Sequence, residues 1–181
     1  MKWVKIALVV LAVLIVVPVL GLAIAGAGAD SNRIATSIVI HQKPEVIWPW
    51  LFKPDKVKMW VTWLVEIREK GEGEPEVGKS AVWVMEDRNN GNQRIEITGT
   101  VEAVEPNRRI AVRLKSPEGF AGTSVYTLTP LPDGSTRLES DSRYMFDNGF
   151  VRFMTPVVCW QAKKKMVSDL EQLRSRVEGG V

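Results

Sequence analysis

The residue types that most often carry acid–base or nucleophilic chemistry are few in this chain and lie far apart. It has a single histidine, His41, and a single cysteine, Cys159. A histidine with an ordinary pKa of ~6.5 can act as a general base, and a cysteine thiol becomes a nucleophile when a base activates it. Neither residue has a partner at a suitable spacing. We therefore expect His41 to lie on the surface or in a loop, and Cys159 to be a small thiol that is buried or close to a membrane.

Paired carboxylates are a second source of acid–base chemistry. Glu139, Asp141 and Arg143 follow one another at every second position and alternate with Ser140, Ser142 and Tyr144. Such alternation places all three charged side chains on one face of a strand. We expect this face to be the solvent face, and we predict no catalytic residues.

The composition also argues against bound metals and phosphates. One cysteine and one histidine exclude a disulfide framework and the usual zinc centres. The sequence has no glycine-rich phosphate loop, no serine-centred nucleophile elbow and no metal-ligand spacing. We predict neither a metal nor a cofactor.

Large apolar and amphipathic side chains are better candidates for a functional site. A pocket for a small molecule is mostly apolar and has a few polar groups that orient the ligand. Tyr126 and Tyr144 would supply such groups through their phenolic hydroxyls. The alternative for each candidate is ordinary packing in a core. The predicted ligand-binding residues are Trp60, Trp63, Trp83, Met85, Ile97, Tyr126, Tyr144, Phe153 and Val157.

Hydrophobic periodicity predicts the elements that position these residues. Residues 34–40 indicate a first strand. Pro44 begins a short helix, and a second short helix follows over residues 55–60. Residues 62–146 alternate in hairpin-like stretches with turn signals between them. Both faces of strand 80–86 are apolar, so the sequence does not decide which face lines the cavity. Helical spacing returns over residues 149–177, with Pro156 expected to begin or kink the main helix.

This order predicts an α+β domain. About seven strands form an antiparallel sheet, and the long C-terminal helix lies across the concave face of the sheet.

Charge disfavours nucleic acid as a partner. Two of the 24 basic residues, Lys2 and Lys5, precede an apolar run, so the remaining 22 nearly balance the 21 acidic residues. A nearly neutral domain offers phosphate little to bind. Lys163, Lys164 and Lys165 are expected on a solvated helix face; their alternative is contact with anionic lipid headgroups.

The apolar run itself predicts a membrane anchor. Residues 6–29 contain 24 residues without a charge, and as a helix they would span ~36 Å, enough to cross a ~30 Å hydrocarbon core. Residues 1–5 would stay in the cytoplasm because of their lysines. The alternative is a signal peptide cleaved after Ala29. Both interpretations place the rest of the chain outside the cytoplasm.

Residues 34–177 resemble the SRPBCC superfamily, which includes START-like and polyketide cyclase/dehydrase proteins. The resemblance rests on Pro44, Glu45, Trp48 and Trp60, and on three segments. These segments are SIVIHQKPEVIWPWLFKPDKVKMW, IEITGTVEAVEPNRRIAV and YTLTPLPDGSTRLES.

The resemblance implies a helix-grip fold, in which a curved sheet wraps around the C-terminal helix and encloses an apolar cavity. It also implies a hydrophobic ligand such as a lipid, sterol or polyketide. A minority of members catalyse cyclisation or dehydration, and they share no catalytic residue that could be carried over. A membrane anchor ahead of the domain is a recurring arrangement in the superfamily.

Together these observations predict a membrane-tethered protein that binds a hydrophobic, lipid-like small molecule and is not an enzyme. One alternative is an enzyme of the cyclase/dehydrase type. Another is a partner-binding module of the cell envelope whose pocket is filled by its own side chains. The sequence makes no prediction about the oligomeric state.

Overall fold

The computed structural model describes residue 21 and residues 31–69, 73–87, 91 and 93–180. The predicted anchor therefore lies outside the described residues, apart from Gly21. Within the described part of the chain, no helix is both long and apolar enough to cross a membrane.

The elements follow the predicted order. They are β1 (Arg33–Ile40), α2 (Pro44–Ile47), η1 (Trp48–Leu51), α3 (Pro54–Val57), β2 (Leu64–Glu69), β3 (Ser80–Asp87), β4 (Gln93–Glu105), β5 (Arg109–Ser116), β6 (Phe120–Pro130), β7 (Thr136–Phe146), α4 (Gly149–Phe153) and α5 (Thr155–Glu178). The second short helix begins and ends earlier than predicted, at Pro54 and Val57, because Pro54 occupies its first turn.

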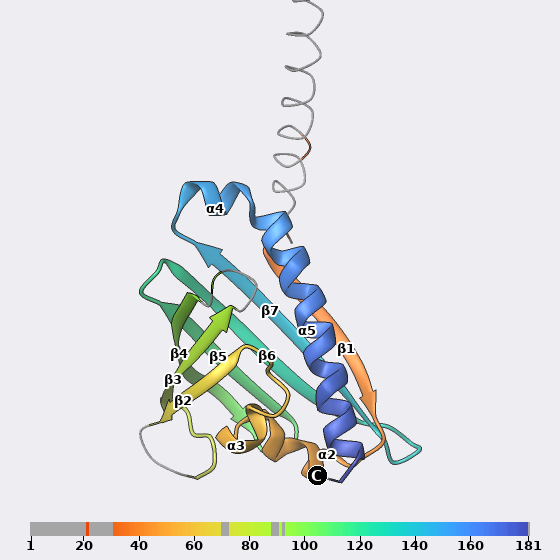
Figure 1. The fold of residues 1–181 in the computed structure, drawn as a ribbon. Coiled ribbons are helices and arrows are strands. Elements are labelled where there is room, and N and C mark those ends of the chain that lie inside the picture. The colour runs from red at the N-terminus through yellow and green to blue at the C-terminus, as the bar shows by residue number, and fades with distance from the viewer. Residues whose placement is uncertain (1–20, 22–30, 70–72, 88–90, 92, 181) are drawn as a thin grey trace, which may run out of the picture.

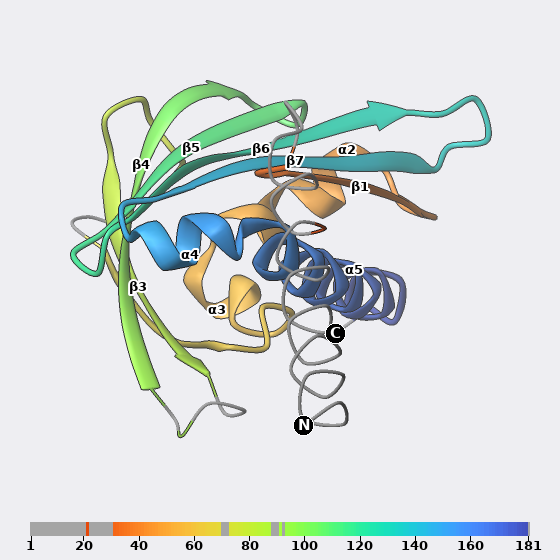
Figure 2. The ribbon, with the colours of Figure 1, turned by 90° about the horizontal axis from the view of Figure 1, so that it is seen from above.

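Seven strands form one antiparallel sheet in the order β1-β7-β6-β5-β4-β3-β2. Strands β2 to β7 follow one another as hairpins, and β1 closes the row beside β7. The sheet curves around the helices, and α5 runs along its inner face on the β1 side (Figures 1 and 2). The predicted α+β class and the curved seven-stranded sheet with a C-terminal helix are confirmed.

The C-terminal helical region is divided at Met154. Helix α4 ends at Phe153, and α5 begins at Thr155 with Pro156 in its first turn. A proline suits that position because its missing N–H would have no partner there. Pro156 therefore begins the main helix.

The register settles which face of β3 points inward. Trp83 and Met85 pack against the core, so their set of alternate residues faces α5. Val84 points to the outer face and is nevertheless buried. It lies opposite Glu66 on β2 and Glu96 on β4, and Arg68 forms ion pairs with both glutamates. The aliphatic parts of such side chains can cover a valine.

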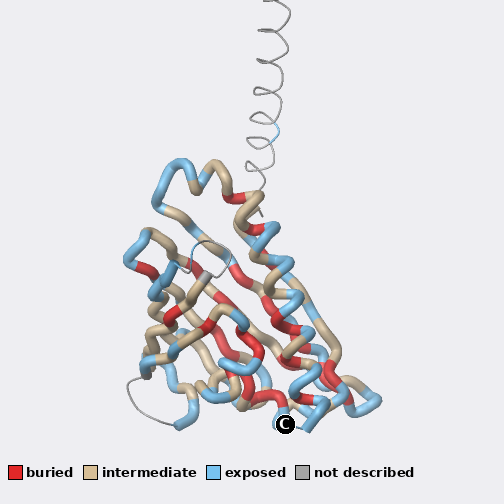
Figure 3. Tube along the Cα trace, in the orientation of Figure 1, coloured by how far each residue is buried: buried red, intermediate tan, exposed pale blue. Residues whose placement is uncertain are grey.

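Two ends of the domain differ in packing. The α2 end comprises α2, η1, α3 and the C-terminal half of α5, and the α4 end comprises α4, the start of α5 and the start of β1. Buried residues gather toward the α2 end (Figure 3). The core includes Ile40, Ile47, Trp50, Trp60, Leu128, Leu138, Leu170 and Leu173.

Candidate functional site

An apolar cavity of about 90 Å³ lies between the inner face of β3–β6 and the η1 helix. Leu51 and Phe52 at the end of η1 line it, together with Gly73, Pro75 and Lys79 from the connection between β2 and β3. The lining residues from the sheet are Ser80, Ala81, Trp83, Gly99, Val101, Ile110, Val112, Leu114, Ser124 and Tyr126.

The cavity originates in small residues that meet across strands. Ala81 on β3 lies directly opposite Gly99 on β4, and Gly99 lies opposite Leu114 on β5. A Cβ atom at Gly99 would come within 3.1 Å of Cγ1 of Val112. Two small residues side by side therefore hollow the inner face at this point. A glycine inside a strand is a sequence signal for such a close approach, and it could have located the cavity.

The hydroxyl groups in the cavity lining are those of Ser80, Ser124 and Tyr126. Oγ of Ser124 lies 2.7 Å from Oγ of Ser142. Ser140, directly opposite Tyr126 on β7, is buried, and its Oγ has no hydrogen-bond partner in the described structure. Ser140 and Ser142 do not line the cavity, so Ser124 and Tyr126 are the hydroxyl groups of β6 that a ligand in the cavity would meet.

Tyr126 is held in place from the α2 end. The Trp60 ring meets the Tyr126 ring edge-on at 88°, with 6.4 Å between centroids. The Trp60 Nε1 group donates a hydrogen bond of 2.8 Å to the Trp50 carbonyl oxygen. Burial raises the pKa of the Tyr126 hydroxyl, and the Ser124 and Ser140 hydroxyls oppose this shift. Tyr126 is therefore a neutral hydrogen-bonding group at physiological pH.

The structure separates the nine predicted ligand-binding residues into groups. Trp83 and Tyr126 line the cavity. Trp60 belongs to the buried core, and Trp63 lies beneath the Lys165 ammonium, 4.9 Å from its ring centroid. The other five do not line the cavity and are only partly buried: Met85, Ile97, Tyr144, Phe153 and Val157.

The remaining candidates occupy the expected kinds of position. His41 is exposed at the end of β1, and its Nδ1 lies 2.9 Å from Oε1 of Glu178. Cys159 is buried, and burial raises the pKa of its thiol, which disfavours the nucleophilic thiolate. No cluster of metal-ligating side chains occurs among the residues described.

The charged face of β7 points outward, as expected. Asp141 accepts hydrogen bonds from Arg33 in an exposed, bidentate ion pair, in which the shortest distance is 2.7 Å, between a guanidinium nitrogen and Oδ2. The Arg33 guanidinium lowers the pKa of the Asp141 carboxyl. A polar depression of about 550 Å³ on this outer face includes both residues and Glu139. Its charges lie on the opposite face of the sheet from the apolar cavity.

The described domain matches a known protein family. Residues 31–178 match the family model described as polyketide cyclase / dehydrase and lipid transport. The chain belongs to this family. The shared features are those of the SRPBCC-like superfamily, and no curated protein matches the sequence.

Solved structures share the fold of this family member at low sequence identity. Protein CV1439 from Chromobacterium violaceum is 20% identical, with a TM-score of 0.64 over 81% of this chain and 98% of its own. A conserved protein from Geobacillus kaustophilus is 13% identical, with a TM-score of 0.66 over 81% of this chain and 95% of its own. DynU16, a putative protein in the dynemicin biosynthetic locus, is 18% identical, with a TM-score of 0.60 over 82% of this chain and 48% of its own.

Proposed function

We propose that this protein binds a hydrophobic small molecule, lipid-like in character, in the cavity between the sheet and the helices. The cavity carries the proposal, because its lining is apolar except for a few hydroxyls and Lys79 at its edge. Apolar walls with a few oriented polar groups are typical of small-molecule sites. The hydroxyls of Tyr126 and Ser124 are uncharged, so the ligand would present an uncharged hydrogen-bonding group to them.

The size of the cavity sets a condition on this proposal. About 90 Å³ is well below the ~300–1,000 Å³ of sites that hold drug-sized ligands. A lipid-like molecule would therefore have to displace lining side chains. Phe52 and Trp83 are suited to move, because both lie at the cavity wall and are only partly buried.

The proposal includes a membrane tether formed by residues 6–29. The support is the sequence alone: 24 consecutive residues without a charge, preceded by Lys2 and Lys5. An anchor would hold the domain on the outer side of the membrane, close to the compartment in which apolar ligands concentrate.

Catalysis of the cyclase/dehydrase type is the second candidate, favoured by the family description and by one observation. A neutral buried hydroxyl such as that of Tyr126 can polarise a carbonyl group of a substrate. Binding remains the better supported function, because the described residues that line the cavity include no carboxylate or histidine to act as a base.

Mass spectrometry of organic extracts from the full-length protein, purified in mild detergent, tests the binding proposal directly. We expect a stoichiometric apolar compound. A fluorescent fatty-acid probe then measures affinity in two variants. Ala81→Leu fills the cavity and should abolish binding, whereas Ala35→Leu, on the exposed outer side of β1, should leave it unchanged.

Tyr126→Phe provides a milder variant that keeps the ring contact with Trp60. Loss of one hydrogen bond should weaken binding of a hydroxylated probe about 2- to 10-fold. An empty extract together with no binding of any apolar probe would refute the proposal. Turnover of a bound polyketide-like substrate would favour the enzymatic candidate instead.

A further inference from the structure

The α4 end presents apolar side chains to the surroundings. Phe150 is 73% exposed, Met145 60% and Trp160 54%. Helix α4 buries none of its residues, although four of its five are glycine, valine or phenylalanine. Isolated apolar residues on a surface need no explanation, but several together mark an interaction site.

Helix α4 is nevertheless held firmly in place by local bonds. Oδ1 of Asn148 accepts hydrogen bonds from the Phe150 and Val151 amides at 2.9 and 3.2 Å. The Arg152 guanidinium donates to the carbonyl oxygens of Phe146 and Asp147. The helix is therefore formed without a buried face, and Phe150 is held away from the core.

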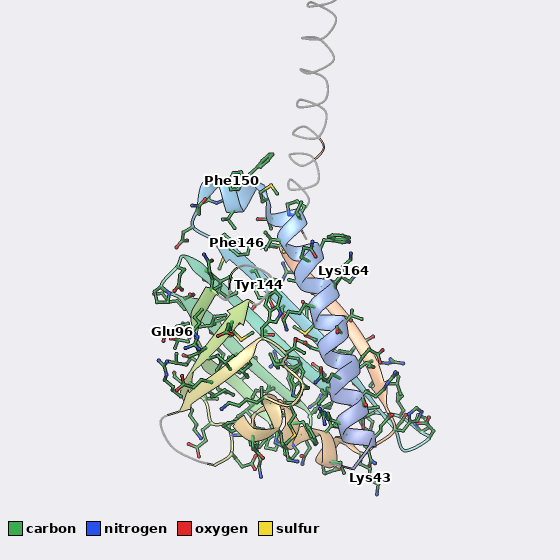
Figure 4. The ribbon with its side chains drawn as sticks, in the orientation of Figure 1. Lys43, Glu96, Tyr144, Phe146, Phe150 and Lys164 are labelled. Atoms are coloured by element: carbon green, nitrogen blue, oxygen red, sulfur yellow. The ribbon has the colours of Figure 1, made fainter. Side chains whose placement is uncertain are left out.

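Basic residues outnumber acidic residues in this part of the sequence. Residues 142–168 contain five basic residues and one acidic residue, Asp147. The Lys164 ammonium lies 3.4 Å from the centroid of the Trp160 ring. Phe150 and Lys164 lie at the same end of the domain, opposite Lys43 (Figure 4). Aromatic rings combined with basic side chains are typical of surfaces that contact lipid headgroups.

The chain also enters the domain at this end. The carbonyl oxygen of Asn32 accepts a 2.9 Å hydrogen bond from the Tyr144 amide, five residues before α4. The uncharged run ends at Ala29, and the three residues to Asn32 can span at most ~10 Å. A tether over residues 6–29 would therefore hold the α4 end within about 10 Å of the membrane.

We infer that the α4 end rests on the lipid bilayer. Phe150 and Trp160 lie in the interfacial region, and Arg152, Lys163 and Lys164 face anionic phosphate groups. This inference rests on the proposed tether.

Site-directed fluorescence on the full-length chain tests this orientation. In a Cys159→Ser background, Phe150→Cys carries an environment-sensitive fluorophore, and the protein is reconstituted in vesicles of equal parts phosphatidylcholine and phosphatidylglycerol. The control is Val77→Cys, which is 66% exposed in the β2–β3 connection at the other end of the sheet. A lipid that bears a quencher near its headgroup should quench the Phe150 probe several-fold more than the Val77 probe. Trp160→Cys should behave like Phe150→Cys.

The possible failures can be told apart. Equal, weak quenching at both positions, with the protein still bound to vesicles, would overturn the inference and leave the tether intact. A Phe150 probe that is blue-shifted but unquenched is covered by protein rather than lipid, and this outcome also overturns it. Protein that does not float with vesicles would refute the tether, whereas ligand binding to the cavity is measured separately.

Discussion

The two ends of the domain are held together in different ways. At the α2 end, bonds join segments that are far apart in sequence. The Thr62 hydroxyl donates to Oδ1 of Asp169 at 2.9 Å, and the Gln172 amide donates to the Met59 carbonyl oxygen at 2.8 Å. At the α4 end, backbone bonds still join Tyr144 to Asn32 and Asp147 to Gly119. The side-chain hydrogen bonds that hold α4, however, stay within six residues along the chain.

Burial follows the same division. Leu138 and Leu173 are fully buried near the α2 end, whereas α4 buries no residue. Long-range contacts and buried apolar area stabilise the folded state most. The α2 end therefore supplies most of the stability of the domain, and helix α4 is free to contact a membrane without loss of the fold.

Removal of the buried carboxylate at Asp169 should produce one of the largest losses of stability. This residue also forms an ion pair with Lys165, and both side chains are largely buried. Asp169→Asn leaves the Lys165 ammonium without its counter-charge, so we expect a loss of about 3 kcal/mol in the free energy of unfolding. Urea denaturation of the full-length protein measures it.

The matched control is Glu171→Gln on the same helix. Glu171 pairs with Arg174 three residues later, and both are well exposed. Removal of an exposed pair should change the free energy of unfolding by less than about 1 kcal/mol. Equal losses in the two variants would show that Asp169 does not join α5 to the α2 end.

Truncation of apolar side chains compares the ends directly. Leu138→Ala opens a cavity in a fully buried site and should lower the free energy of unfolding by about 2–5 kcal/mol. Phe150→Ala removes a larger but exposed ring and should change it by less than about 0.5 kcal/mol. Thermal or urea denaturation of both variants measures these changes. A large loss of stability in Phe150→Ala would mean that α4 has a packed face.

The sheet itself is tightly packed even toward the α4 end, and Gly122 tests this. A Cβ atom there would lie 2.4 Å from the Arg143 carbonyl oxygen and 2.9 Å from Cδ1 of Tyr144. Gly122→Ala should therefore separate β6 from β7 and lower the free energy of unfolding by about 1–3 kcal/mol. Gly149→Ala meets nothing within 4 Å and should be neutral. A neutral Gly122→Ala would show that these strands separate easily.

The elements could be predicted from the sequence because their signals are local. Alternation of apolar residues predicted the strands, and Pro44 and Pro156 predicted where helices begin. The break after Phe153 and the shorter α3 were not predicted. They depend on where the last backbone hydrogen bonds close, which a periodic pattern does not specify.

The position of the cavity could not be predicted in the same way. Alternation tells which residues share a face but not which residues meet across strands. The cavity depends on Ala81 lying beside Gly99, and that register is set where the hairpin between β3 and β4 closes. Size favoured Trp60 as a cavity residue, but its Nε1 group reaches the Trp50 carbonyl oxygen and the ring completes the core instead.

The two tyrosines of the chain give the finest test, because Tyr126 lines the cavity and Tyr144 lies toward the α4 end. Burial raises the pKa of both hydroxyls. In the unfolded chain they ionise near pH ~10. Above that pH the unfolded state loses protons that the folded state retains, so the free energy of unfolding falls as pH rises.

We expect the folded protein to show less tyrosinate absorbance near pH ~10 than the unfolded chain, and each tyrosine to contribute to the fall in the free energy of unfolding above that pH. Tyr126→Phe and Tyr144→Phe should each make the free energy of unfolding fall less steeply with rising pH. Denaturation at several pH values measures this. If Tyr144→Phe removes none, its hydroxyl already contacts water in solution. The α4 end would then be open along the inner face as far as Tyr144, and the boundary between the two ends would lie between the two tyrosines.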